Sequence, residues 1–306
     1  MDTTDTQAPI APTQNQNPQQ PPETEYVLHR RFDRMGRLVG DATMKKLMNT
    51  HVMVVGIGGV GSWAAESLAR SGVGHITVVD FDEVCITNTN RQLHAIQGMV
   101  GKKKAEVMGE RLRKINPQMK VTVIPEFYNA EKSDRMLAIK PDFLIDAIDN
   151  LTAKAHLLAT CVKENIHVIT SAGSAAKMDP LRIQKKDLGI THTCPLAHQL
   201  RKILRQKYDF PEKEFGIPCV FSDEPVMMPE ELTYDKGMGF KCVCPKTNDF
   251  HGCDNRNMIY GSASYITGAF GLVMASHIVN EVRASTAAGS AVAPAGAEAE
   301  AEGAKA

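Results

Sequence analysis

The sequence predicts an α/β fold: a Rossmann-like, doubly wound and mainly parallel sheet with an elaborated C-terminal half. One observation is the stretch 51–80, where an apolar run leads through a glycine-rich turn and a helical segment to a second β-branched run. The other is the continued alternation of short apolar runs and helical segments up to residue 170, as in βαβ units. A chain of 306 residues with ordinary apolar and charged fractions can bury one large core of this kind.

The glycine-rich turn is the most informative stretch, and it reads Gly56-Ile-Gly58-Gly59-Val-Gly61-Ser62. Glycines let the backbone approach a phosphate at a helix N-terminus, where unpaired N–H groups and the helix dipole favour an anion. Asp80 ends the next apolar run, where its carboxylate can accept hydrogen bonds from ribose hydroxyls. Such turns serve NAD, FAD, S-adenosylmethionine and ATP enzymes alike, and some bind nothing. The turn alone therefore predicts a nucleotide without naming it.

Bulk composition sets broad limits on the function. The 35 basic and 35 acidic side chains cancel, so only a local patch could attract nucleic acid. Residues 1–25 and 284–306 have too little to bury, and we expect both tails to be disordered. The first of these tails lacks the pattern of a signal peptide, and seven cysteines in such a chain favour a reducing compartment. The expected location is the cytoplasm.

The elements expected before residue 180 alternate between helix and strand. A helix from Asp41 leads into the first strand at 51–55, and the second strand covers 76–79. The following elements are a helix at 101–115, a strand at 121–124, a helix at 131–139, a strand at 142–146, a helix at 151–164 and a strand at 166–170. The region 26–180 is therefore expected to form the nucleotide-binding part of the domain.

The pattern becomes less regular beyond Pro180. We expect 181–188 to be a strand that leaves the main sheet and 194–208 to be a basic helix. The stretch 210–257 is rich in Pro, Gly, Cys and Asp, and so long a loop is usually functional or mobile. The apolar stretch 262–282 holds too many polar and small side chains for a membrane span, which favours a helix packed in the core. No membrane partner is expected.

Cations and carboxylates are spread between Arg34 and Asp149. Arg34, Arg91 and Lys104, together with Asp82 and Asp149, are the groups that a site needs to hold a triphosphate and a divalent metal. Asp149 follows the carboxyl end of a predicted strand, which is the edge where ligands bind in open parallel sheets. Simpler interpretations stay open: the Arg34 cluster as a solvated helix face, and Asp149 with Asn150 as the cap of the helix at 151–164.

Several short motifs resemble, in order and spacing, the adenylating domain shared by ubiquitin-activating enzymes and by bacterial enzymes that activate sulfur-carrier proteins. The match spans roughly residues 31–173 and includes the glycine-rich turn. The other motifs are Arg31-Phe-Asp-Arg34, Asp80-Phe-Asp82, Asn88-x-x-Arg91-Gln92, Lys104-Ala105, Asn116-Pro117 and Asp146-x-x-Asp149-Asn150. Each motif could arise elsewhere, but the ordered set is highly specific.

This resemblance implies an enzyme that adenylates a carboxylate with ATP and magnesium, releasing pyrophosphate. It implies a magnesium ligand in Asp149 and, in Arg34, an arginine that reaches the nucleotide of a neighbouring subunit, hence a homodimer. The implied catalytic residues are Arg34, Arg91, Lys104 and Asp149, and the implied ATP-binding residues are Gly56, Gly58, Gly59, Gly61, Asp80, Asp82, Asn88 and Asn150.

The second half narrows the resemblance to one branch of that family. Asp179-Pro180, Pro195-Leu196-Ala197, Cys219-Val-Phe-Ser222 and Gly261-Ser262-Ala263 are similar to the members that dehydrate threonylcarbamoyladenosine at position 37 of tRNA. The implied reaction is an ATP-dependent cyclisation through an acyl-adenylate. Region 181–283 would then bind the anticodon loop and pack the dimer. Arg201, Lys202 and Arg205 are candidate tRNA contacts, or simply a solvated helix face.

The cysteines depart from the pattern of the sulfur-carrier enzymes, which often hold zinc through two Cys-x-x-Cys pairs. This chain has no such pair, and Cys194 replaces an acid expected before Pro195. Metal binding and sulfur transfer both stay open as roles for four unusually spaced cysteines: Cys219, Cys242, Cys244 and Cys253. A sulfur-relay protein stays open as a partner of these cysteines, and so does a monovalent-ion requirement.

Two other functions compete with the tRNA-modifying enzyme. One is an adenylyltransferase that activates the C-terminal Gly-Gly of a ubiquitin-like sulfur carrier, and the absent Cys-x-x-Cys pairs and the basic second half argue against it. The other is a nucleotide-binding scaffold without catalysis. Intact Arg91, Lys104 and Asp149 argue against the scaffold.

Overall fold

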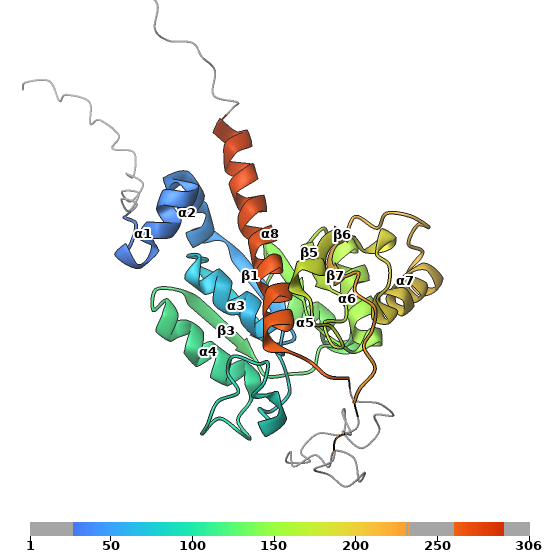
Figure 1. Ribbon diagram of the computed structural model, residues 1–306. Helices are drawn as coiled ribbons and strands as arrows, with labels where there is room; N and C mark the ends of the chain where they lie inside the picture. Colours follow the sequence, from blue (N-terminus) through green and yellow to red (C-terminus); the bar gives the residue numbers. More distant parts are fainter. Residues whose placement is uncertain (1–26, 231, 233–259, 291–306) are drawn as a thin grey trace, which may run out of the picture.

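The computed structural model describes residues 27–230, 232 and 260–290. Within these residues, seven strands form one sheet in the order β3-β2-β1-β4-β5-β7-β6 (Figure 1). All neighbouring pairs are parallel except β6 and β7, which are antiparallel. The strands are β1 (His51–Val55), β2 (His75–Val79), β3 (Lys120–Ile124), β4 (Phe143–Asp146), β5 (His167–Ser171), β6 (Ile183–Asp187) and β7 (Pro218–Ser222). This confirms the Rossmann-like, mainly parallel fold.

Helices cover both faces of the sheet, as expected for a doubly wound fold. They are α1 (Asp33–Val39), α2 (Asp41–Asn49), α3 (Gly61–Arg70), α4 (Lys104–Ile115), α5 (Ala130–Leu137), α6 (Leu151–Lys163), α7 (Pro195–Tyr208) and α8 (Ser264–Ser290). Short 3₁₀ turns lie between some of these elements: η1 (Arg30–Phe32), η2 (Ile86–Asn88), η3 (Pro180–Arg182) and η4 (Leu188–Ile190). The predicted starts of α2 at Asp41 and of α6 at Leu151 agree with the structure.

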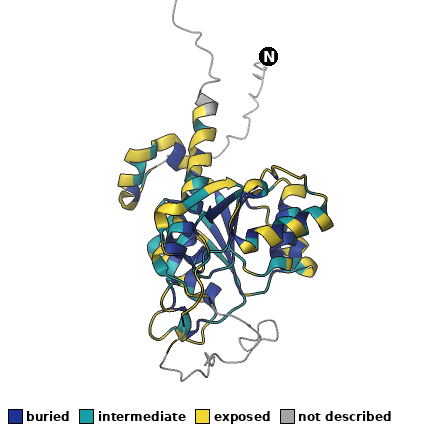
Figure 2. Ribbon diagram, turned by 45° about the vertical axis from the view of Figure 1, so that its right-hand side comes forward, coloured by how far each residue is buried: buried dark blue, intermediate teal, exposed yellow. Residues whose placement is uncertain are grey.

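The core is two apolar layers separated by the sheet. Successive side chains of a strand point to opposite faces, so Val52 and Val54 of β1 pack with α2, α3, α4 and α8, whereas Met53 and Val55 pack with α5, α6 and α7. Both faces of β1 are covered, which is why its sequence is continuously apolar rather than alternating. Figure 2 shows the buried strands at the centre and the exposed surfaces of the helices outside.

Two predictions for the second half are wrong. β6 does not leave the main sheet but forms its antiparallel edge, because β7 lies between β5 and β6. β7 itself was expected to be loop within 210–257. It is only five residues long, begins at a proline and is buried along most of its length, so it shows neither alternation nor length to mark it in a stretch rich in Pro and Gly.

The C-terminal helix also extends further than predicted. α8 continues to Ser290, so the segment 284–290 is helical rather than part of a disordered tail. Its alanines favour helix once a buried helix precedes them. A hydrogen bond between the hydroxyls of Thr43 and Thr286, and one from Lys46 to Ser285, hold this end against α2. The predicted tail 1–25, and the predicted tail 284–306 from residue 291 onward, lie outside the described residues.

None of the helices in the described ranges has the length and apolarity required to span a bilayer.

The order of the strands places a ligand site at the carboxyl end of β1. The chain runs from β1 outward to β2 and β3, then crosses to β4 on the other side of β1. The helices that follow β1 and β4 therefore lie on opposite faces of the sheet, and open α/β sheets bind ligands in the crevice at such a switch point. The glycine-rich turn follows β1, and residues 147–150 follow β4.

Two histidines are stacked at the amino edge of the sheet. The rings of His51 and His75 lie 3.6 Å apart and almost parallel, and each ring nitrogen Nε2 is hydrogen-bonded to a threonine, Thr77 or Thr122. Burial, assisted by His75, lowers the pKa of His51 from 6.5 to about 4. The folded protein therefore holds His51 in its neutral form at pH values where an unfolded chain would protonate it.

Acidification should consequently destabilise the protein. Between the unfolded pKa of 6.5 and the folded value of about 4, the unfolded chain binds more protons, so the free energy of unfolding decreases as the pH falls through this window. The variant His51→Gln cannot take up the proton and should lose less melting temperature over the same window. The variant should retain some pH dependence, because the pKa of buried His94 is also lowered by folding, to about 3. Identical pH profiles of the melting temperature for both proteins would contradict this account.

Candidate functional site

The glycine-rich turn is shaped by very close backbone packing. Gly56 has a φ of +91° and donates from its N–H to the carbonyl of Val79 at 2.8 Å. A Cβ at Gly56 would lie 2.7 Å from the carbonyl oxygen of Ala147, and one at Gly61 would overlap the carbonyl oxygen of Gly56. These two glycines therefore let β1, the loop after β4 and the start of α3 approach one another.

The two middle glycines have different surroundings. A Cβ on Gly58 would meet only the side-chain nitrogen of Gln92, at 3.8 Å, so this backbone is open on one side. Gly59 instead lies against Thr267 of α8, whose side-chain atoms would be 3.1 to 3.2 Å from a Cβ. Gly58 thus has open space beside its backbone, whereas Gly59 and Gly61 are held by protein contacts. Of the glycines predicted to bind phosphate, Gly58 is the one whose surroundings leave room for it.

Asp80 supports the turn from below. Its carboxylate accepts from the backbone N–H groups of Ile57, at 2.6 Å, and of Asp82, at 2.9 Å. It is buried, and burial raises its pKa above the usual value, with Asp82 adding to the shift and Lys104 opposing it. The side chain that sequence analysis assigned to ribose therefore also fixes the shape of the turn.

A buried lysine stands among three carboxylates at the same edge. Lys104 begins α4, and its Nζ lies 2.9 Å from Oδ2 of Asp82. Burial opposes its charge, but Asp80, Asp82 and Asp149 outweigh that effect and raise the pKa of Lys104 above its usual value. The structure thus brings Lys104 and Asp149 into electrostatic contact across the crevice, although their positions are 45 residues apart in the chain.

The loop 88–92 borders the turn. Asn88 is buried and accepts from the N–H of Cys85 at 3.0 Å, while the guanidinium of Arg91 donates to the carbonyl of Thr87 at 2.9 Å. Gln92 is buried beside Gly58, and its Oε1 has no hydrogen-bond partner among the described residues. Gln92 was part of the recognised motif but received no role in the sequence analysis; its place after Arg91 was the available signal.

Asp149 and Asn150 have separate roles in the folded loop. Asn150 Oδ1 accepts from the N–H of Ala153 at 3.0 Å, so this residue is the N-cap of α6, as the simpler interpretation held. Asp149 is exposed just beyond the carboxyl end of β4, and its charge contributes to the raised pKa of Lys104. An exposed carboxylate of this kind suits Mg²⁺, which often takes only one or two protein carboxylates.

Arg34 lies away from the other site residues of the same chain. It is an exposed residue of α1, and the neighbouring Arg31 donates to the carbonyl of Ile115 at the far end of α4. Lys104 is at the near end, and a helix of this length spans roughly 18 Å. Figure 1 shows α1 and α2 at one end of the molecule and the loop leading into α4 at the other. Within one chain, Arg34 does not join the site.

The arginines proposed for tRNA have partners inside the protein. Arg201 donates to the hydroxyl of Thr191 at 2.6 Å, and Arg205 donates to the carbonyl of Pro211 and lies 5.3 Å from the centre of the ring of Phe215. Lys202 is exposed. Of these three side chains, Lys202 is the one that is free to extend toward an RNA backbone.

The described cysteines are buried. Cys194 accepts from the N–H of Gly173 at 3.3 Å, and burial raises the pKa of the thiol of Cys219 to about 12, which disfavours a reactive thiolate. Among the described residues, no three His, Cys, Asp or Glu side chains are grouped to hold a metal. Cys242, Cys244 and Cys253 lie outside the described residues, so their metal, their carried sulfur and a sulfur-relay partner stay predictions.

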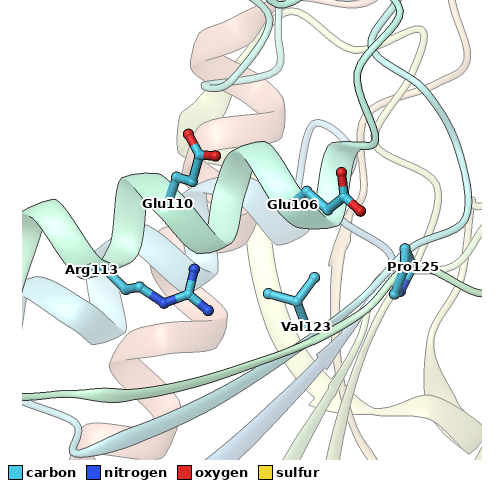
Figure 3. Close-up of a pocket in the computed structure, with 5 residues that line it drawn as sticks. All are labelled: Glu106, Glu110, Arg113, Val123 and Pro125. Carbon is cyan, nitrogen blue, oxygen red and sulfur yellow. The ribbon is translucent and has the colours of Figure 1, made fainter.

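A separate shallow hollow lies between α4 and the edge strand β3. Figure 3 shows it, lined by Glu106, Glu110, Arg113, Val123 and Pro125. Glu106 is two residues after Lys104 and so projects from the opposite side of the helix. Two carboxylates would repel phosphates, so this hollow is not the nucleotide site.

Comparison with known proteins assigns the chain to a family. The model of the ThiF family matches residues 32–292. The chain belongs to the ThiF family. It is 40% identical to the tRNA threonylcarbamoyladenosine dehydratase of Escherichia coli over 260 residues. The match covers 84% of this chain and 95% of the relative. The glycine-rich turn and the Lys104 cluster thus lie in a ThiF-type fold.

A solved structure supports the same assignment. The crystal structure of the E. coli dehydratase in complex with ATP superposes with a TM-score of 0.73 and 37% identity, covering 85% of this chain and 96% of that chain. The E. coli molybdopterin-synthase adenylyltransferase is 31% identical over 133 residues, which covers 44% of this chain and 52% of the relative. Among ThiF-family members, the dehydratase is therefore similar over both halves of the chain, and the carrier-activating enzyme over less than half.

The unequal packing of the glycines gives a test of the turn. Gly61→Ala should destabilise the protein by about 1 to 3 kcal/mol or more, because its Cβ overlaps the carbonyl of Gly56. Gly58→Ala is the matched control for stability: its Cβ meets no close atom, so unfolding should change by less than about 0.5 kcal/mol. ATP affinity should nevertheless fall in Gly58→Ala. Thermal melting and nucleotide titration measure both effects, and a Gly58→Ala protein that binds ATP normally would refute the assigned phosphate position.

Proposed function

We propose that this protein catalyses the ATP-dependent dehydration of threonylcarbamoyladenosine at position 37 of tRNA, giving the cyclic form. The observation that carries the proposal is the Lys104 cluster beside the open backbone of Gly58, in a chain similar over most of its length to dehydratases of that name. Region 26–180 would bind ATP, and region 181–283 would contact the anticodon loop and pack the dimer.

The described residues fit ATP and magnesium. Gly58 leaves space for a phosphate at the start of α3, and the side-chain amide nitrogen of buried Gln92, a hydrogen-bond donor, lies beside it. Lys104 supplies a permanent positive charge, and exposed Asp149 supplies one carboxylate ligand. When bound, magnesium would neutralise charge on the phosphates as pyrophosphate departs.

The chemistry proceeds in two steps that balance without a protein nucleophile. The threonyl carboxylate attacks the α-phosphorus of ATP, an oxygen–phosphorus bond forms, and pyrophosphate leaves. The carbamoyl oxygen or nitrogen then attacks the acyl carbon, an N–H of the carbamoyl group gives up its proton to solvent, and AMP leaves, so one water is removed from the nucleoside overall. Lys104 and Arg91 would stabilise the developing negative charge on the phosphates, and the turn would hold the reacting groups in line.

An adenylyltransferase for a ubiquitin-like sulfur carrier is the alternative. Its supporting observation is the similarity to the molybdopterin-synthase adenylyltransferase, which includes the nucleotide-binding motifs. That enzyme would use the same first step on a C-terminal Gly-Gly carboxylate. The shorter match and the similarity of the second half to dehydratases favour the tRNA substrate.

A homodimer would complete the site. Arg34 is too distant to serve the nucleotide of its own chain, so it can act only on a nucleotide held by a second copy. Apolar side chains are exposed near the start of α8: Leu181 is 92% exposed, and half-exposed Met178 and Tyr265 touch each other. Such a surface suits burial against a second copy. The proposed location of the enzyme, with its tRNA, is the cytoplasm.

Incubation with ATP, magnesium and threonylcarbamoylated tRNA should lower the mass of the modified nucleoside by one water. Lys104→Ala and Asp149→Ala should reduce this conversion at least about a hundredfold, because each removes charge from the phosphates in the transition state. Lys202→Ala serves as a control on the RNA side, with a raised KM for tRNA and an unchanged rate at saturation.

Mass spectrometry of the digested tRNA gives the answer. An unchanged nucleoside together with an adenylated ubiquitin-like carrier would favour the adenylyltransferase. ATP bound without pyrophosphate release on either substrate would instead favour a nucleotide-binding scaffold.

Mixing two inactive variants tests the shared site. Arg34→Ala and Lys104→Ala should each be inactive, yet their hybrid dimer contains one site with Lys104 from one copy and Arg34 from the other. Random exchange of subunits should therefore restore about a quarter of the native activity. Activity is measured after mixing and re-equilibration. A mixture that stays inactive, although mass measurement shows hybrid dimers, would contradict the role of Arg34.

A further inference from the structure

A fully buried ion pair lies beneath the loop that carries Asp149. Lys154 of α6 and Asp146 at the end of β4 have no exposed side-chain surface, and Lys154 Nζ lies 2.8 Å from Asp146 Oδ2. Burying two charges costs more free energy than their attraction returns in many proteins, and apolar replacements are often tolerated. Such a pair therefore calls for an explanation other than stability.

The Lys154–Asp146 pair forms hydrogen bonds with both backbone polar groups of Ile148, its N–H and its carbonyl. The N–H of Ile148 donates to Asp146 Oδ1 at 3.2 Å, and Lys154 Nζ donates to the carbonyl of Ile148 at 3.1 Å. The hydroxyl of Thr170 donates to Asp146 Oδ2 at 2.7 Å and so fixes the carboxylate. Because the carbonyl of Ile148 belongs to the peptide bond that joins it to Asp149, Lys154 sets the orientation of the Asp149 backbone.

The residues on either side of this segment are fixed as well. Asn150 caps α6 through the N–H of Ala153, and its carbonyl accepts from the N–H of Lys154 at 2.9 Å. The carbonyl of Ala147 lies against Gly56 of the glycine-rich turn. Asp149 is thus an exposed side chain on a backbone that is held on both sides.

We infer that Lys154 and Asp146 are positioning residues, which hold Asp149 in the orientation that binds a metal–nucleotide complex. The inference rests on the proposed function, since the metal role of Asp149 belongs to it. A loop held only by its helix cap could turn the Asp149 carboxylate away from the phosphates. The ion pair removes that freedom without touching the ligand itself.

The test removes both charges at nearly constant volume, with Lys154→Met combined with Asp146→Asn. The amide oxygen introduced by the second change can still accept from the N–H of Ile148, and the amide nitrogen can donate to the hydroxyl of Thr170, but the carbonyl of Ile148 loses its donor. The double variant should melt cooperatively and bind Mn²⁺, in the presence of a non-hydrolysable ATP analogue, about tenfold more weakly or worse. Thr170→Val is the matched control, because it removes the hydroxyl that donates to the same carboxylate and alters neither contact to Ile148. Its Mn²⁺ affinity should match that of the native protein.

The same double substitution in an Asp149→Ala protein distinguishes a positioning role from general damage to the site. In Asp149→Ala, which has lost the metal ligand, the double substitution should cause no further loss of Mn²⁺ affinity, because the two changes act through one group. Titration followed by electron paramagnetic resonance measures bound Mn²⁺ directly and needs no tRNA.

The outcomes are distinct. Native Mn²⁺ affinity in the double variant, or loss of cooperative melting, would overturn the inference, since the pair would then be dispensable for the metal or required for the fold itself. If Asp149→Ala binds Mn²⁺ as the native protein does, the proposed metal role falls and the inference with it. If only the tRNA conversion fails while the Mn²⁺ results hold, the proposed substrate is wrong and the positioning role stands.

Discussion

The site depends on one close backbone approach, that of Gly61 to the carbonyl of Gly56. Because no side chain intervenes, α3 begins within a few residues of the end of β1, and its N-terminus points into the crevice beside β4. Gly56 allows the same closeness toward the loop after β4, where its neighbour is Ala147. The ends of β1 and β4, whose chains continue in different directions, are thereby brought together at a single turn. The charged residues are arranged around this turn.

Charge burial at this edge is possible only because opposite charges arrive from different elements. Lys104 comes from α4, Asp80 and Asp82 from the segment after β2, and Asp149 from the loop after β4. Neither α4 nor the segment after β2 could bury its charge, Lys104 or Asp80, without the opposite charge of the other. The cluster therefore forms when the sheet is assembled, and it keeps Lys104 protonated in a place where desolvation would favour the neutral amine.

Local sequence predicted the first half of this fold well, because each element there carries a strong local signal. The run at 51–55 is apolar throughout, Asp41 and Asn150 stand at helix starts, and the glycine turn separates strand from helix. Proximity of Lys104 to Asp149 followed from the resemblance and from the rule that strand ends share an edge, and the structure places them in electrostatic contact.

The rest depended on long-range contacts that a local pattern does not show. β7 is too short to signal itself, and its insertion beside β5 is what returns β6 to the sheet. The position of Arg34 at the opposite edge follows from the contact that Arg31, just before α1, makes with the carboxyl end of α4. Likewise, the sequence presents Arg201 and Arg205 as surface charges. In the structure they contact Thr191, Pro211 and Phe215.

The contact of Gly59 with Thr267 has a consequence for synthesis on the ribosome. More than two hundred residues separate Gly59 from Thr267 in the chain, and Asn90 donates to the carbonyl of Ser262, 172 residues away. While translation is in progress, the nascent N-terminal half exposes the apolar side of α3 that α8 later covers. Such non-local closure is slow, so chaperones have a long interval in which to bind the unfinished chain.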